Sequence, residues 1–271
     1  MQRPSFTECA NRHGSDKGTL GPSAGWGGNN FADVYEGLFL PLRDRALHIL
    51  EIGLGVPGPN WQAHIAHGRN AEGGGSIKAL HEYFPAAELW GVDINPATHL
   101  DRERLRTAQV DQGDPASWAA FLAKTSGAPF DLIIDDGSHR PDHQQVSLDV
   151  LWPHLAPGGI FIVEDLMDNG RGDGSSAQSR HRADEVVSTR RLLKGLAETG
   201  QLEGPHALSD PERLAAETAS VTFHAPVISA PAPRLLRQIV TDTLRGRPVQ
   251  FGRHVSYLEG SERVAILRKT A

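Results

Sequence analysis

The chain has 271 residues, a net charge of −6 and a sequence pI of about 6.1, and its length suffices for one large α/β domain. It contains no block of lysine and arginine, which argues against nucleic acid or an anionic membrane surface as a partner. Its single cysteine, Cys9, excludes an intrachain disulfide, and the chain shows no signal-like or membrane-spanning apolar run, so a cytoplasmic protein is expected.

Residues 1–45 are expected to form an N-terminal segment ahead of a main domain that covers 46–271. A glycine-rich run leads into a predicted helix over 31–40, with Asn30 as its N-cap. Two interpretations of the first 30 residues remain open. They are either a frayed terminus or a lid over a ligand, in which case the side chains that reach the ligand are Asp16, Lys17 and Tyr35.

The first predicted strand, 47–52, runs into a glycine turn. Gly53 and Gly55 allow the backbone to pass close to a ligand, and Glu51 stands just before them. The third glycine of the dinucleotide-binding pattern is missing at its usual spacing, because an insertion begins there, and this argues against an NAD pyrophosphate site. Ser76 ends the insertion and is predicted to cap a helix over 77–84.

The second predicted strand, 88–93, ends at Asp93. An acid at this place accepts hydrogen bonds from ribose hydroxyls in many nucleotide-binding folds, but Asp93 is also a suitable turn residue before Asn95. A short helix is predicted over 98–106, followed by a third strand over 107–110.

The acidic loop after the third strand carries Asp111 and Gln112, whose side chains suit an adenine amino group. Asp114 follows them and is predicted to cap a helix over 115–124, with Pro115 in the first helical position. Capping and ligand binding are compatible in this loop.

Two short apolar runs, 130–134 and 160–163, end in acids and flank a predicted crossover helix over 141–155. A βαβ unit makes the two strands parallel, so their carboxyl ends lie on one edge of the sheet, where ligands bind in open α/β folds. The polar residues that follow the strands are Asp135, Asp136, His139, Glu164 and Asp165. Such an oxygen-rich cluster suits Mg²⁺, although acids at strand ends also cap helices.

The last third of the chain contains helix-like segments near 183–198 and 231–244 and a possible extra strand within 220–229. Residues 254–258 and 263–268 have the pattern of an antiparallel hairpin. The predicted fold class is therefore α/β, a doubly wound, Rossmann-like sheet of parallel strands with a C-terminal antiparallel hairpin, in a single domain.

Taken together, Glu51-x-Gly-x-Gly55, Asp93, the acidic loop after the third strand and the terminal hairpin resemble class I S-adenosylmethionine methyltransferases. More narrowly, the chain is similar to the metal-dependent sugar O-methyltransferases of antibiotic biosynthesis. Four motifs carry this resemblance: His-Gly-Ser-Asp-Lys17, Gly-Gly-Gly-Ser76, Asp-Asp-Gly-Ser-His139 and Ile-Val-Glu-Asp165. It covers roughly residues 11–168 and the C-terminal hairpin, and the Asp-Gly-Ser-His and Glu-Asp pair is its most specific part.

The resemblance implies that Mg²⁺ is bound by Asp136, Glu164 and Asp165, and that His139 is the catalytic base. It implies S-adenosylmethionine as the cofactor, with contacts from Glu51, Gly53, Gly55, Ser76, Asp93, Asp111, Gln112 and Asp135. The implied acceptor is a hydroxyl of a deoxysugar, linked to a nucleotide or to a natural product, and a homo-oligomer is expected. Residues 169–250 do not align with the family and are expected to form an insertion and helices on the acceptor side.

Three alternatives differ in substrate or in class. The first is methyl transfer to a catechol or another small diol, although an aromatic content of 6% provides no obvious stacking wall for a planar phenol. The second is a relative of the cephalosporin hydroxylases, which share the fold and a similar acid cluster. The third is a cofactor-binding subunit without catalysis, against which the intact acid and histidine set argues.

Overall fold

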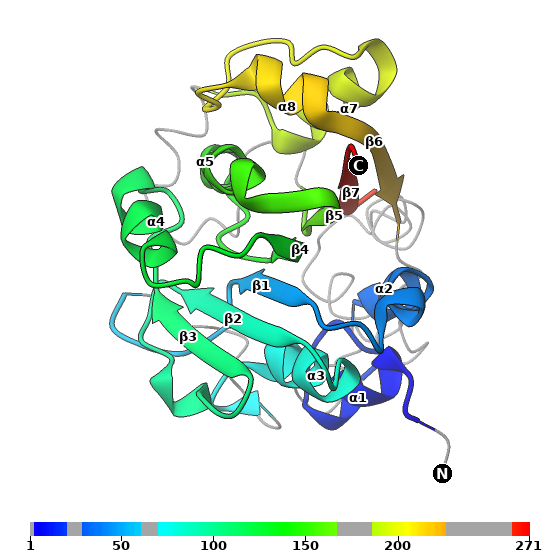
Figure 1. Cartoon of the computed structure of the whole chain (residues 1–271), viewed down its shortest axis with the longest axis vertical. Helices are drawn as coiled ribbons and strands as arrows, with labels where there is room; N and C mark the ends of the chain where they lie inside the picture. Colours follow the sequence, from blue (N-terminus) through cyan, green and yellow to red (C-terminus); the bar gives the residue numbers. More distant parts are fainter. Residues whose placement is uncertain (1–2, 21–28, 61–69, 167–185, 226–261) are drawn as a thin grey trace, which may run out of the picture.

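The computed structural model describes residues 3–20, 29–60, 70–166, 186–225 and 262–271 (Figure 1). These residues form a seven-stranded sheet in the order β3-β2-β1-β4-β5-β7-β6. The first five strands pair in parallel, and β7 runs antiparallel to both β5 and β6. This confirms the predicted doubly wound α/β sheet with an antiparallel edge. The strands are β1 (His48–Ile52), β2 (Glu88–Asp93), β3 (Leu105–Gln109), β4 (Phe130–Asp135), β5 (Leu155–Val163), β6 (Thr218–His224) and β7 (Val264–Lys269).

Helices cover both faces of the sheet (Figure 1). The described α-helices are α1 (Phe6–Arg12), α2 (Phe31–Phe39), α3 (Gly75–Tyr83), α4 (Pro115–Leu122), α5 (Pro141–Leu151), α7 (Thr189–Thr199) and α8 (Pro211–Glu217). Three short 3-10 helices accompany them: η1 (Leu40–Leu42), η3 (Thr98–Leu100) and η4 (Trp152–His154).

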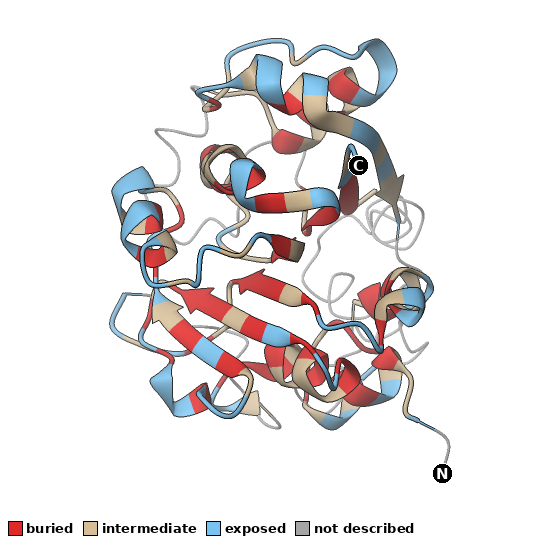
Figure 2. Cartoon of the chain, in the orientation of Figure 1, coloured by how far each residue is buried: buried red, intermediate tan, exposed pale blue. Residues whose placement is uncertain are grey.

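The alternation of side chains along the strands divides the core into two layers. Ile49 and Ile134 pack with α1, α2 and α3 on one face, whereas Leu50 and Ile133 pack with α4, α5, α7 and α8 on the other. Both layers are buried, as the central strands in Figure 2 show. Burial on both faces explains why these strands have continuous apolar sequences rather than an alternating pattern.

The N-terminal segment contributes to the first of these layers. Phe6, Cys9, Phe31 and Phe39 are at most 1% exposed, and the Phe6 ring makes an edge contact with that of Phe39. The interpretation as a frayed terminus is therefore wrong for residues 3–20 and for the start of α2. These residues stay ordered because they bury large apolar side chains.

One predicted helix start is wrong, and one predicted N-cap residue makes no capping hydrogen bond. Asp114 caps α4 as expected, because its carboxylate accepts a hydrogen bond from the Ala116 N–H. Ser76 is not the cap of α3: the helix begins at Gly75, two residues earlier than predicted, and its N-cap is Gly74, whose φ of +71° suits glycine. Asn30 occupies the N-cap position of α2 but makes no capping hydrogen bond with its side chain.

The predicted helix over 98–106 is wrong beyond its first turn, since only η3 forms. Arg104 has a φ of +63°, which ends any helix, and its guanidinium donates to the carbonyls of Phe84 and Ala87. The third strand then begins at Leu105, two residues earlier than predicted.

The antiparallel edge is built by β6, which confirms the extra strand predicted near 220–229 and begins at Thr218. Helix α7 begins at Thr189 rather than near 183, because the Ser188 hydroxyl caps it by accepting from the Arg191 N–H. The predicted helix 231–244 and the predicted hairpin arm 254–258 lie outside the described residues. In the ranges that the structure describes, no helix is both long and apolar enough to cross a membrane.

Candidate active site

The carboxyl ends of β4 and β5 lie side by side, as predicted for the βαβ unit. The two strands pair up to Asp135 and Val163, and the Glu164 N–H donates to the Asp135 carbonyl at 2.9 Å. On the other side of β4, the Asp136 N–H donates to the Ile52 carbonyl at 2.9 Å, so β1 ends at the same edge. The main chain therefore brings the predicted acids together before any side-chain contact is considered.

Lys17 reaches into this acid cluster from the N-terminal segment. Its Nζ donates to Asp136 Oδ2 at 2.5 Å and to the two Glu164 oxygens at 2.7 and 2.8 Å. A third carboxylate, that of Glu51, lies 4.0 Å from the same nitrogen. Burial alone lowers the pKa of Lys17, but these carboxylates outweigh it and raise the pKa well above its ordinary value. Lys17 is therefore a buried ammonium surrounded by acids, with 1% of its side chain exposed.

Glu164 is fully engaged by protein donors. Besides both hydrogen bonds from Lys17, its Oε1 accepts one from the Tyr35 hydroxyl of α2. Its backbone carbonyl accepts from the Gln144 amide of α5 at 3.0 Å. Lys17 and Tyr35, which were predicted to reach a substrate, thus lie at the predicted site, but here they bind one of its acids.

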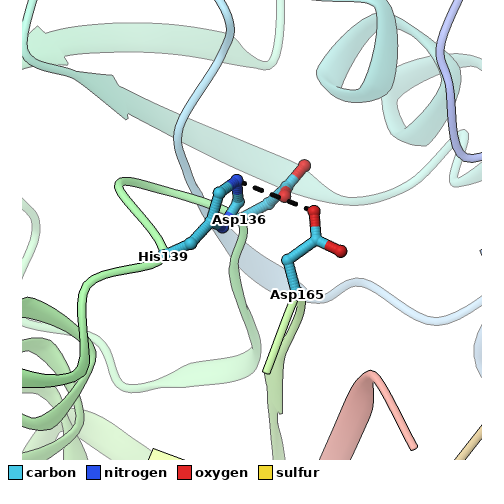
Figure 3. Close-up of side chains that lie close together, drawn as sticks. All are labelled: Asp136, His139 and Asp165. Atoms are coloured by element: carbon cyan, nitrogen blue, oxygen red, sulfur yellow. Dashed lines mark ion pairs between the residues drawn. The ribbon is translucent and has the colours of Figure 1, made fainter. Parts of the chain in front are cut away.

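A second group of donors converges around His139 (Figure 3). Ligand atoms of Asp136, His139 and Asp165 all lie within 4.8 Å of one another, and the three residues are partly exposed. His139 Nε2 is 3.7 Å from Asp165 Oδ2, while Asp165 Oδ1 forms an ion pair with Arg263 at the start of β7. His139 and Asp165 have φ values of +57° and +49°, an unusual conformation for residues other than glycine that is enriched at functional sites.

These three residues fit a hard divalent cation. Two carboxylates and an imidazole present one donor atom each to a shared space, and the carboxylate oxygens among them are the usual protein ligands of Mg²⁺. Two of the predicted metal ligands, Asp136 and Asp165, belong to this group together with the predicted base His139, whereas the third predicted ligand, Glu164, does not. Glu164 is instead held by Lys17 and Tyr35.

The residues of the glycine turn support the site in different ways. Gly53 is required by β4, because a Cβ at Gly53 would lie 2.0 Å from the Asp136 carbonyl oxygen. Gly55 also has a positive φ, of +60°, but a Cβ there would meet no described atom within 4 Å. Asp93 lies beneath the turn, where its carboxylate accepts backbone hydrogen bonds from Leu54 and Asn95. The turn interpretation of Asp93 is therefore confirmed, and a ribose contact remains a prediction.

Buried polar atoms mark the space beside this turn. Both carboxylate oxygens of Glu51 and the Ser76 hydroxyl are buried without a hydrogen bond of normal geometry to a described residue, although the Ser76 hydroxyl lies near enough to Glu51 to lower the pKa of its carboxyl group. Burial raises the pKa of Glu51 to about 7, even though the Lys17 ammonium opposes the rise. Unsatisfied buried groups of this kind are typical of a site that a polar ligand completes, which fits the predicted cofactor contacts.

Gln112 and Asp135 form a hydrogen-bond network behind the loop that carries Asp136. The Gln112 amide donates to both Asp135 oxygens at 2.8 and 2.9 Å, and its Oε1 accepts from the Ser138 N–H at 2.9 Å. Ser147 of α5 also donates to Asp135. Asp111 does not belong to this network; its carboxylate accepts a hydrogen bond from the nearby Gly113 N–H. Cofactor contacts from Asp111, Gln112 and Asp135 remain predictions.

Comparison with known proteins identifies relatives that are named as O-methyltransferases of antibiotic pathways. The chain is 36% identical over 193 residues to the 8-demethyl-8-alpha-L-rhamnosyl tetracenomycin-C 2'-O-methyltransferase of Streptomyces olivaceus, a match that covers 71% of this chain and 46% of that protein. It is 37% identical over 137 residues to the mycinamicin VI 2''-O-methyltransferase of Micromonospora griseorubida, covering 50% and 31% of the two chains. The chain is a homologue of the antibiotic-pathway sugar O-methyltransferases.

A solved structure of MycE from the mycinamycin pathway, in complex with Mg and SAH, shares the fold of this chain. The TM-score is 0.64 at 22% identity, and the match covers 99% of this chain and 55% of MycE. The chain spans about half the length of these curated relatives or less. No family model matches the chain.

The sequence did not indicate two residues of the site. Arg263, which pairs with Asp165, lies 98 residues away from it along the chain. Ser147 lies in the middle of the crossover helix. Neither stands in a motif, so only the pairing of β5 with β7 and the packing of α5 reveal them. Asp16, the remaining predicted substrate contact, accepts from the Asn29 side chain at 3.2 Å, and burial raises its pKa to about 6.

Proposed function

We propose that this protein is an S-adenosylmethionine- and Mg²⁺-dependent O-methyltransferase that acts on a hydroxyl of a deoxysugar, linked to a nucleotide or carried by a natural-product glycoside. The observation that carries the proposal is the convergence of Asp136, His139 and Asp165 at the ends of β4 and β5, in a homologue of sugar O-methyltransferases. The proposed acceptor is a small-molecule glycoside. We also propose that residues 1–45 cover the site.

The predicted residues have separate roles in this proposal. Asp136 and Asp165 hold the cation, and Glu164 joins them when its protein donors release it. When bound, Mg²⁺ supplies Lewis-acid stabilisation of negative charge on the acceptor oxygen. Glu51, Ser76 and Gly55 receive the cofactor, since Glu51 and Ser76 present buried polar atoms beside the turn and no described atom lies within 4 Å of where a Cβ of Gly55 would be.

His139 is proposed as the general base that removes the acceptor proton. Imidazole has the appropriate pKa range near neutral pH, and Nε2 faces the Asp165 carboxylate at 3.7 Å, which stabilises the imidazolium that forms. Its Nδ1 is buried without a hydrogen-bond partner among the described residues. Asp165 is itself fixed by Arg263, so the orientation of the acid next to the base is set by the residue that precedes β7.

A turnover screen tests this function. The protein is incubated with S-adenosylmethionine and panels of nucleotide sugars, glycosylated natural products and catechols, each with Mg²⁺ or with EDTA, and products are read by mass spectrometry. We expect a methylated deoxysugar product that forms only with the metal. Methylation of catechols alone would replace the proposed acceptor class, and metal-independent turnover would remove the role given to the acid cluster.

A further inference from the structure

Lys17 occupies a position that conflicts with a complete set of metal ligands. It donates to both oxygens of Glu164 and to one oxygen of Asp136, at 2.5 to 2.8 Å. No other described residue of the N-terminal segment brings a cation to these acids. The two acids that it contacts are both predicted ligands of a divalent ion, and in one of them, Glu164, both oxygens already accept hydrogen bonds from the protein.

The acids of the site form ion pairs with two cationic side chains of the protein, Lys17 and Arg263. Asp165 gives one oxygen to Arg263 and turns the other toward His139. Asp136 gives Oδ2 to Lys17 and still contributes to the group with His139 and Asp165. Glu164 alone is absent from that group. Two side chains, Lys17 and Tyr35, hold Glu164 outside the group of converging donors, and of these two Lys17 is the charged one.

We infer that Lys17 is a resident counter-ion that competes with the divalent cation for Glu164, so that metal binding through Glu164 requires the Lys17 ammonium to withdraw. This inference rests on the proposed metal-dependent function. It makes Lys17 the residue that sets metal affinity, and it links metal binding to the N-terminal segment, because the Lys17 carbonyl accepts from the Ala32 N–H of α2 at 2.8 Å.

The physical reason is electrostatic. Glu51, Asp136 and Glu164 surround a single ammonium in a buried space. An ammonium neutralises part of this charge when no metal is present, whereas a divalent ion neutralises more of it and repels the ammonium at close range. The ion and Lys17 cannot both contact the two oxygens of Glu164.

The first test measures Mn²⁺ affinity by calorimetry in the wild type, in Lys17→Met and in Lys124→Met, all without cofactor. Methionine keeps an unbranched side chain and removes the competing charge, while Lys124 is exposed and matches the change in net charge. We expect Lys17→Met to bind Mn²⁺ at least about tenfold more tightly than both other proteins. Equal or weaker binding by Lys17→Met would overturn the inference.

The second test uses wild-type protein, in case Lys17→Met does not fold. Lysines are acetylated briefly with and without saturating Mn²⁺, and labelling at Lys17 is read by peptide mass spectrometry against Lys124 as the internal reference. Several-fold stronger labelling of Lys17 with metal supports withdrawal, and unchanged labelling at saturation contradicts it. If the wild type binds no Mn²⁺ at all, the proposed metal dependence of the enzyme fails as well. If it binds Mn²⁺ tightly while Lys17 stays protected from acetylation, only the inference about Lys17 is contradicted.

Discussion

At the scale of single residues, the site contains more buried acidic side chains than cationic side chains that could neutralise them. Glu51, Asp16 and Asp135 all have raised pKa values, in each case chiefly because burial disfavours the carboxylate. Such groups weaken the fold when they ionise and become useful when a ligand completes them. The protein therefore holds its functional acids in an environment that favours a cationic partner.

The first prediction concerns pH and Glu51 in the protein without metal or cofactor. A carboxyl group whose pKa rises from 4.5 to about 7 on folding contributes stability below pH 4.5 and loses it as the pH rises through 7. Glutamine stays neutral, so Glu51→Gln gains stability relative to the wild type as the pH rises, by up to about 3 kcal/mol at pH 8. Urea unfolding in EDTA at about pH 5 and pH 8 measures this; a difference that does not change with pH would contradict it.

The second prediction concerns His139. Replacing it with alanine removes the proposed base, so the methyl-transfer rate falls by about 10²–10⁴-fold. Binding of S-adenosylhomocysteine and of Mn²⁺, followed by calorimetry, stays within about threefold of the wild type if His139 acts mainly on the acceptor proton. A wild-type rate would refute the base assignment, and a large loss of Mn²⁺ affinity would make His139 a metal ligand.

At the scale of elements, the sheet edge positions the site through main-chain contacts. β1, β4 and β5 end together because Asp136 and Glu164 continue the hydrogen bonding of their neighbours. The loop after β1 then passes so close to Asp136 that only glycine fits at position 53. The glycine turn is thus partly a packing requirement of the chain at the end of β4, where Asp136 lies.

The two glycines of this turn give a matched prediction. Gly53→Ala suffers both the strain of a φ of +85° and a clash with the Asp136 carbonyl, whereas Gly55→Ala, at +60°, suffers the strain alone. We expect losses in the free energy of unfolding of at least about 3 kcal/mol for Gly53→Ala and about 1–2 kcal/mol for Gly55→Ala. Chemical denaturation measures both, and equal losses would show that the close approach to Asp136 is not limiting.

The sequence predicted elements well where local patterns decide them. The βαβ unit from β4 to β5 and the Asp114 cap follow from apolar runs, proline and glycine positions that act over a few residues. Ser76 shows the limit, because Gly74 adopts the left-handed conformation and starts α3 earlier. The contact of Lys17 with Glu164 spans 147 residues, and no local pattern encodes such a pairing.

At the scale of the whole molecule, the site is assembled from distant parts of the chain. The N-terminal segment supplies Lys17 and Tyr35, the sheet supplies the acids, and β7 near the C-terminus supplies the ion pair that orients Asp165. Because each part packs into one of two continuous core layers, ligand binding at the sheet edge is expected to stabilise the entire fold.

Thermal unfolding tests this coupling. A ligand that binds only the folded state raises the melting temperature, so Mg²⁺ and S-adenosylhomocysteine should each raise that of the wild type. Asp136→Ala is expected to keep the rise caused by S-adenosylhomocysteine and to lose that caused by Mg²⁺. Asp33→Ala, an acid on the exposed side of α2, is the control and keeps both. Loss of both rises in Asp136→Ala would mean that the two ligands do not have separate sites.

The central claim is that the ends of β4 and β5 share one divalent ion. The most direct measurement is a crystal structure of the protein with Mn²⁺ and S-adenosylhomocysteine, in which anomalous scattering locates the metal. The account predicts one strong peak bound by Asp136 and Asp165, with Glu164 released from Lys17 and turned toward the ion. A map with no peak there, in which the Lys17 ammonium still bridges Asp136 and Glu164, would contradict it.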